Sequence, residues 1–221
     1  MTYLQLLQAL HREAGLAGSA PSSVTGTSGM PQKLANWIAA AWIEIQSARK
    51  WSFLLTEQDV SLTVGKRDYE VVADLGLTDV REFDQAFAAS MLPDGSDIGR
   101  LRWIGWQAFR ERYGLSEAIS ARPSRVSAML PTKLRFDTEP DQAYKIRLAY
   151  YMTAEQLANN ADTPSLTEEE QWVIVWRALM FYAAHEGAAD VYGDAQAKYQ
   201  AAFSVLCQRY LPNITFGAPL A

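Results

Sequence analysis

The residues with the greatest potential for catalysis or metal binding are few and widely spaced. The chain has two histidines, His11 and His185, and one cysteine, Cys207. A zinc-protease helix needs a second histidine four positions after the first, but the residue four positions after His185 is Ala189. Cys207 lies in an apolar, helix-like stretch with no histidine close in sequence, so we expect a packed thiol rather than a nucleophile. These residues predict no metal site and no cofactor.

The acidic clusters are better explained by local structure than by catalysis. Glu168, Glu169 and Glu170 follow Thr167, as expected for the first turn of a helix. A second group, Asp137, Glu139 and Asp141, surrounds a proline in a turn-like segment. No phosphate-binding loop, dinucleotide-binding glycine motif or GxSxG nucleophile motif occurs in the sequence. The sequence therefore predicts a protein without enzymatic activity.

Both ends of the chain have helical periodicity. Thr2 and Gln5 form the pattern of a capping box, and the first helix is expected to run to Ala14, before Gly15. A Gly/Ser/Thr-rich loop over 15–29 leads to a second helix that begins near Pro31. A third helix is expected after Thr167, with a break at Gly193-Asp194 and an end at Pro212. The apolar face of these helices includes four tryptophans, namely Trp37, Trp42, Trp172 and Trp176.

The middle of the chain has the pattern of antiparallel β-structure. Alternating residues on either side of Gly65-Lys66 predict a β-hairpin. Further strands are expected over 80–91, 100–104, 125–130, 133–136 and 144–151, and a short helix over 106–113. The last strand alternates between apolar residues and a basic, aromatic face.

This order of elements predicts an α+β protein. We expect residues 1–52 and 153–211 to form a helical bundle. Residues 53–152 would form an antiparallel, β-rich lobe with one short helix, and residues 212–221 an extended tail. The C-terminal helical region, 177–208, is dense in Ala and Gly, which indicates either close packing within the bundle or a seam between subunits.

The charge distribution is uneven. The net charge is −5, but residues 100–147 contain ten Lys and Arg against five Asp and Glu. This basic segment could be the solvated face of a sheet, a surface that meets an acidic neighbour, or a nucleic-acid contact. Sequence-specific DNA binding is the weakest of the three, because the chain is acidic overall and has no known DNA-binding motif. The tryptophans could stack on bases, but their helical spacing favours core packing.

The sequence lacks the patterns of secretion and of membrane insertion. We find neither a signal-peptide pattern nor a run of about 18 apolar residues. A single cysteine also fits a reducing compartment. These features predict synthesis in a cytoplasm and no membrane partner.

Several segments are informative together: residues 2–7, the Gly/Thr-rich loop, residues 34–38 leading into 41–46, residues 51–54, the 139–141 turn before the 144–151 strand, and residues 192–195. These segments resemble phage head-to-tail adaptor and connector proteins, including tail tubular protein A and the tail accessory factor of short-tailed phages. The resemblance implies a virion protein at the head–tail junction, with no catalytic residues. It also implies a homo-oligomeric ring, commonly of twelve subunits, between the portal protein and the next tail component (nozzle, tube or collar). Double-stranded DNA would pass through the lumen of this ring without sequence specificity.

Two sets of residues are candidates for contacts in such an assembly. The first is a subunit interface in the basic segment, formed by Arg100, Arg102, Trp103, Trp106, Arg125 and Arg135. The second is the tail, whose apolar residues Ile214, Phe216 and Leu220 would dock on the portal or on a neighbouring subunit. Another tail part, such as a tail-completion or tube-terminating protein, is the main alternative, and a nucleic-acid-binding module is the second.

Overall fold

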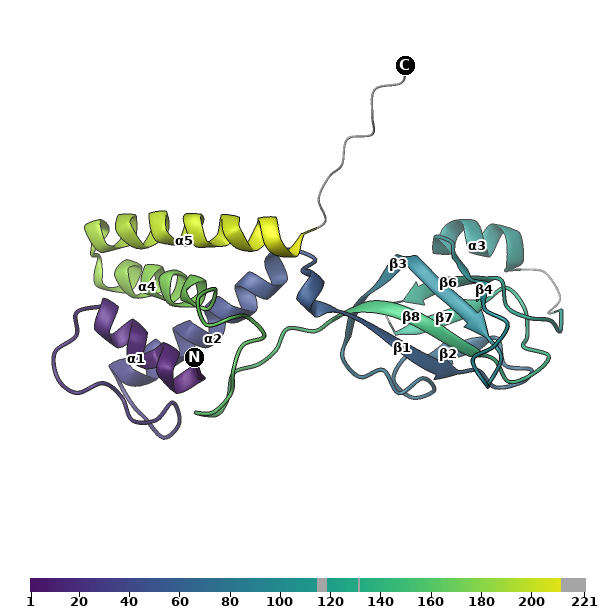
Figure 1. Ribbon diagram of the computed structural model, residues 1–221, viewed down its shortest axis with the longest axis horizontal. Helices are drawn as coiled ribbons and strands as arrows, with labels where there is room; N and C mark the ends of the chain where they lie inside the picture. The colour runs from purple at the N-terminus through teal and green to yellow at the C-terminus, as the bar shows by residue number, and fades with distance from the viewer. Residues whose placement is uncertain (115–118, 131, 212–221) are drawn as a thin grey trace, which may run out of the picture. The chain divides into compact units, whose positions relative to one another are not determined.

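The computed structural model describes residues 1–114, 119–130 and 132–211 (Figure 1). The chain divides into two compact units. One unit contains Met1–Phe53 and the described part of Ala154–Ala221, and the other contains Leu54–Thr153. Helices occur at both ends of the chain and strands in the middle, which confirms the predicted α+β class.

The helical unit is built around one central helix. It contains α1 (Tyr3–Glu13), α2 (Met30–Ala48), α4 (Trp172–Glu186) and α5 (Ala189–Tyr210). Helix α4 packs against the other three and buries residues on most of its circumference. The predicted capping box at Thr2 and Gln5 is present, with both reciprocal hydrogen bonds formed. No helix in the described residues is long and apolar enough to cross a membrane.

The β-rich unit consists of two four-stranded sheets that share one core. The first sheet has the order β1 (Leu55–Ser61), β8 (Lys145–Met152), β3 (Val80–Met91) and β4 (Gly99–Arg100). The second has the order β2 (Asp68–Glu70), β7 (Lys133–Phe136), β6 (Arg125–Leu130) and β5 (Arg102–Trp103). One short helix, α3 (Trp106–Tyr113), belongs to this unit, and a single 3-10 turn, η1 (Ser52–Leu54), precedes β1.

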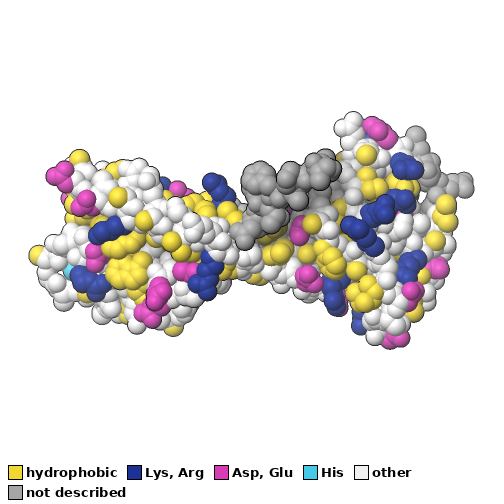
Figure 2. All heavy atoms as spheres, turned by 45° about the horizontal axis from the view of Figure 1, so that its top comes forward, with side chains coloured by type: hydrophobic (Ala, Val, Ile, Leu, Met, Phe, Trp, Pro, Cys, Tyr) yellow, Lys and Arg dark blue, Asp and Glu magenta, His cyan; other side chains and the backbone are white. Residues whose placement is uncertain are grey.

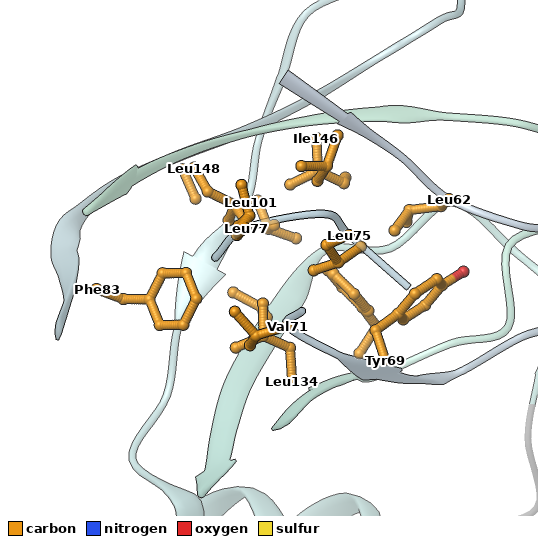
Figure 3. Close-up of a cluster of buried hydrophobic side chains, with 14 of the residues drawn as sticks. Leu62, Tyr69, Val71, Leu75, Leu77, Phe83, Leu101, Leu134, Ile146 and Leu148 are labelled. Carbon is orange, nitrogen blue, oxygen red and sulfur yellow. The ribbon is translucent and has the colours of Figure 1, made fainter. Parts of the chain in front are cut away.

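Apolar side chains from both sheets and from the connecting loops meet in this core (Figure 3). Ile146 and Leu148 come from the first sheet, Leu134 comes from the second, and Leu75 and Leu77 come from the loop after β2. Each sheet therefore has one apolar face buried against the other sheet, as in a β-sandwich.

The predicted β-hairpin around Gly65-Lys66 is wrong. Strand β1 pairs along its whole length with β8, and β2 pairs with β7 in the other sheet. The connecting turn is held by residues distant in sequence, since the Gly65 N–H donates to the Pro140 carbonyl at 2.9 Å. Alternation in the sequence indicates strands in this region, although β1 ends at Ser61, before Leu62 and Val64. It contains no information about which strands pair with them.

The predicted strand over 100–104 is divided between the two sheets. Arg100 pairs with Ala89 of β3, whereas Arg102 and Trp103 pair in parallel with Arg125 and Val126 of β6. Leu101, between them, is only 2% exposed and belongs to the core. The burial of this one side chain marks the point at which the chain crosses from one sheet to the other.

The expected helix break at Gly193-Asp194 is also wrong. Both residues lie within α5, and the turn between α4 and α5 occurs at Gly187, whose φ is +69°. Glycine adopts this left-handed conformation at little cost, which makes it the usual residue after a helix end. The α4 helix likewise begins at Trp172 rather than directly after Thr167, although Thr167 donates to the Glu170 carboxylate at 2.7 Å.

The tryptophans are buried to different extents. Trp42 and Trp51 are fully buried, in agreement with a packing role. Trp37, Trp172 and Trp176 are only partly buried, and the rings of Trp172 and Trp176 stack with centroids 5.2 Å apart. The apolar face of α4 is instead formed by smaller residues such as Ile174 and Leu179.

Ion pairs between neighbouring strands connect the outward faces of the sheets. Asp59 and Arg147 pair across β1 and β8 at 2.7 Å, and Asp68 pairs with Arg135 across β2 and β7. Hydrogen bonds from the Arg135 guanidinium hold the pKa of Asp68 below its usual range. The Arg147 guanidinium has the same effect on the pKa of Asp59.

We expect opposite effects from two Gly→Ala substitutions. Gly187→Ala should lower the free energy of unfolding by about 1 kcal/mol, because it places a Cβ on a left-handed residue. Gly193→Ala should raise it by about 0.5–1 kcal/mol, because this position is in a helix interior and has open space around it. Urea unfolding followed by circular dichroism measures both, and a greater loss of stability from Gly193→Ala would contradict the observed helix boundary.

The Asp68–Arg135 pair should make stability depend on pH in the acid range. Because folding lowers the pKa of Asp68, the contribution of the pair is complete above the unfolded pKa of about 4 and is lost as the pH falls through the folded value. The stability difference between the wild type and Asp68→Asn should therefore shrink on acidification from pH 7. Glu57→Gln, at an exposed position on β1, is the control, and a difference that stayed constant with pH would contradict the expectation.

Candidate interaction surfaces

The segment from Arg100 to Trp103 is held in place by both sheets. The Leu101 N–H donates to the carbonyl of Ala88 at 3.1 Å, and the Arg102 N–H donates to the carbonyl of Ser124 at 3.0 Å. Because successive side chains of an extended segment point to opposite sides, the inward position of Leu101 directs both Arg100 and Arg102 outward. Both arginines are exposed.

The predicted interface arginines fall into two groups. Arg125 and Arg135 have carboxylate partners within their own chain, Asp137 at 3.5 Å and Asp68 respectively. Among the described residues, no carboxylate lies within 4.0 Å of Arg100 or Arg102. Only the second pair therefore has its full charge available to a neighbouring molecule.

Arg125 contributes to a buried polar network. Asp137, 8% exposed, accepts hydrogen bonds from the backbone N–H groups of Ser124 and Arg125, both at 3.0 Å, and from the Ser124 hydroxyl at 2.6 Å. The guanidinium of Arg125 also lies over the ring of Tyr113, 5.7 Å from its centroid. The contacts of Arg125 thus connect α3 to the start of β6.

The two predicted interface tryptophans have different surroundings. Trp103 is partly buried, its ring centroid lies 5.3 Å from that of Phe83, and its Nε1 donates to the Phe87 carbonyl at 3.4 Å. Trp106 begins α3, stacks on Phe109 with centroids 6.1 Å apart, and lies beneath the guanidinium of Arg135. Both rings contribute to packing inside the β-rich unit, and each keeps part of its surface accessible.

A bulge in β3 lies beside Arg100 and Arg102. Phe83 pairs with Tyr150 and Ala88 with Leu148, so four residues of β3, 84–87, stand opposite the single residue Ala149 of β8. The Ala86 N–H donates to the Asp84 side chain at 3.0 Å, and Phe87 is 42% exposed. A shallow groove of about 310 Å³ lies between the bulge and the crossing segment, lined by Gln85, Ala86, Arg100, Leu101, Arg102 and Trp103.

The bulge was not expected from the sequence. The spacing of Phe83 and Phe87 does not by itself depart from a period of two, because both would lie on one face of a regular strand. The feature that could have indicated the bulge is Gln85, a polar residue at a position between Phe83 and Phe87 where a regular strand would place an apolar one. The small residue Ala86 follows it. Bulges are common next to functional surfaces of sheets, because they direct side chains out of the regular pleat.

The basic segment is largely neutralised within its own unit. The residues of Leu54–Thr153 include 13 Lys and Arg against 15 Asp and Glu, although residues 100–147 alone have an excess of positive charge. Partners such as Asp59 and Asp68 come from the first strands of the unit. Figure 2 shows Lys and Arg side chains gathered on one face of this unit, with acidic side chains close to several of them.

The side chains that could bind a metal or act as a nucleophile do not form a cluster in the described residues. No cluster of three or more His, Cys, Asp or Glu side chains with the spacing of a metal site occurs among the described residues. His185 Nε2 lies 3.0 Å from the Lys33 ammonium and its ring lies 5.4 Å from that of Trp37. Cys207 is partly rather than fully buried. The candidate docking residues Ile214, Phe216 and Leu220 lie outside the described residues.

Comparison with known proteins identifies a family for the chain. A search of curated proteins found no match. A family profile described as SU10 adaptor protein matches residues 1–215, which include the helices at both ends and all the strands between them. The expected resemblance to phage head-to-tail adaptors is thereby confirmed, and with it a structural role as a phage adaptor. The chain belongs to the SU10 adaptor protein family.

Proposed function

We propose that the protein forms a homo-oligomeric ring of twelve subunits at the head–tail junction of a phage virion. In this position the ring would bind the portal protein on one side and the next tail component on the other. The observation that carries the proposal is the family match, because it extends over both units rather than over one isolated module. The protein would be made in the host cytoplasm and act without catalysis.

The charge of the chain suits a ring through which DNA passes. A net charge of −5 provides little tendency to hold phosphates. Each cation that neutralises a phosphate releases counterions, so a lumen lined with many cations would bind the DNA and slow its passage. The pairing of Arg125, Arg135 and Arg147 with carboxylates supports this proposal, since these side chains are already neutralised within the subunit.

The C-terminal tail, residues 212–221, would dock on the portal. Its apolar residues Ile214, Phe216 and Leu220 alternate with small or polar residues, and Pro212 and Pro219 disfavour a continuous helix. A peptide with this pattern can bind in an extended form to a sheet edge or groove of a partner.

Deletion of residues 212–221 should leave a folded protein that no longer binds the portal. Circular dichroism should show unchanged secondary structure, because α5 ends at Tyr210, before the deletion. Co-sedimentation with purified portal protein measures the binding. The triple substitution of Ile214, Phe216 and Leu220 by Ser should have the same effect, since it removes the apolar contacts and keeps the length. Full portal binding by both variants would refute the docking role.

Cryo-EM of the full chain mixed with its portal protein tests the proposed ring directly. We expect twelve copies in a closed ring on one face of the portal, with an open channel on the axis. A ring that binds only the distal end of a tail tube would instead indicate a tube-terminating protein. A complex with a single copy, or with none, would overturn the proposal.

A further inference from the structure

We propose that the shallow groove between the β3 bulge and residues 100–103, which we call the bulge groove, binds an extended acidic segment of a neighbouring protein. Arg100 and Arg102 would each pair with one carboxylate, and the two carboxylates would be two residues apart in the bound segment. The inference rests on the proposed function only for the source of the segment, since an adaptor meets other virion proteins. The binding itself is a property of one subunit and requires no ring.

Two arginines without carboxylate partners line this one groove. The bulge groove has a volume of about 310 Å³ and is formed by Gln85, Ala86, Arg100, Leu101, Arg102 and Trp103. Both arginines are exposed, and no carboxylate among the described residues lies within 4.0 Å of either guanidinium. A ligand that supplies two carboxylates therefore complements the charge of the groove.

The backbone beneath the groove fixes the spacing of the two arginines. Leu101, 2% exposed, is held in the core, and its N–H donates to the carbonyl of Ala88 at 3.1 Å. Arg100 and Arg102 lie on the side of the segment opposite the Leu101 side chain, about 7 Å apart, because alternate residues of an extended chain point the same way. Alternate side chains of a bound extended peptide have the same spacing. Two acidic residues separated by one other residue can thus pair with both arginines.

The sheet next to the groove has backbone groups that a peptide can use. The N–H groups of Arg102 and Ile104 both donate to carbonyls of β6, at 3.0 Å. In a parallel ladder this pattern directs the N–H and C=O of the residue between them, Trp103, away from β6. Residues 84–87 of β3 leave the regular pairing with β8 at the bulge. An extended segment in the groove can therefore hydrogen-bond to the Trp103 backbone, as a strand does when it is added at a sheet edge.

The surroundings of the groove favour an acidic peptide over the backbone of a nucleic acid. Asp84 lies in the bulge, and its carboxylate is fixed there by the Ala86 N–H at 3.0 Å. The whole unit carries 13 Lys and Arg against 15 Asp and Glu. A phosphodiester backbone has a negative charge at every nucleotide and would be repelled by such neighbours. A peptide can place neutral residues opposite Asp84 and its carboxylates opposite the arginines.

Arginine is well suited to this ligand. Its planar guanidinium binds a carboxylate through two parallel hydrogen bonds, whereas a lysine ammonium acts as a point charge. Trp103 is partly buried beside the arginines, and Tyr, Trp and Arg are the residues most enriched at protein interfaces. The lining of the bulge groove thus has the composition of a protein contact.

Nuclear magnetic resonance titration of the full chain measures the binding. The probe is a short synthetic peptide with blocked ends, in which one Val separates two Glu residues. We expect a dissociation constant of about 1 mM, because exposed ion pairs contribute little individually, and this method detects binding of that strength. The backbone amide resonances that shift should include those of Gln85, Ala86 and residues 100–103. A peptide with Gln in place of both Glu should bind at least tenfold more weakly.

Substitution of the two arginines tests their role in binding. Arg100→Gln with Arg102→Gln should raise the dissociation constant of the Glu peptide at least tenfold. The matched control is Arg110→Gln with Arg112→Gln, which removes the same charge from two exposed positions of α3 and should change the constant less than twofold. Ala86→Glu, which places a competing carboxylate in the groove, should weaken binding with both arginines present. The amide spectrum of each variant shows whether it is folded.

The outcomes separate the groove from the ring. Resonance shifts outside the groove, an equal loss of binding in the α3 control, or tighter binding of a DNA oligonucleotide than of the Glu peptide would each overturn the proposal. If the peptide binds as expected but the chain forms no ring with its portal, the proposed function fails and the groove stands. If the ring forms but the peptide does not bind, the groove assignment is wrong and the ring stands.

Discussion

The arrangement of the strands in the β-rich unit depends mainly on one constraint: each sheet buries one apolar face against the other sheet. A four-stranded sheet on its own would leave its apolar face in contact with water. The opposite face of each sheet carries charged side chains and is suited to solvent. Packing the two faces together removes side chains such as Phe136 and Leu148 from water. At roughly 25 cal/mol for each Å² of apolar surface, this burial is the main favourable contribution to the fold of the unit.

The same constraint places the residues that a partner could contact. Leu101 must enter the shared core, and the chain changes sheets at that residue, so Arg100 and Arg102 are directed to the outside in adjacent sheets. The bulge of β3 has a related cause. Both Phe83 and Ala88 are buried, and the four residues between them extend outward because β8 provides only one residue opposite them. The candidate surface is thus a consequence of core packing rather than an addition to it.

The basic side chains of this unit differ in whether they have a carboxylate partner within the chain. Arg135 and Arg147 each face a carboxylate on the neighbouring strand, and such pairs favour one strand register over others. Arg100 and Arg102 have no such partner among the described residues, although they belong to the same basic stretch of sequence. A count of charges along the chain therefore overestimates the positive surface available to DNA or protein, because it cannot show which charges are already paired.

Local patterns in the sequence were sufficient for the class of fold, the helices at both ends and the positions of most strands. The capping box at Thr2, the helix over 106–113 and the strands over 125–130 and 133–136 depend on neighbours within a few residues, so their signals are present in the sequence. The sheet partners of β1 and β2, the crossing at Leu101 and the bulge at 84–87 depend on residues as far away as β8. Because alternation records only which side of a strand is buried, the tertiary structure alone decided which strands pair and which arginines remain free for a neighbour.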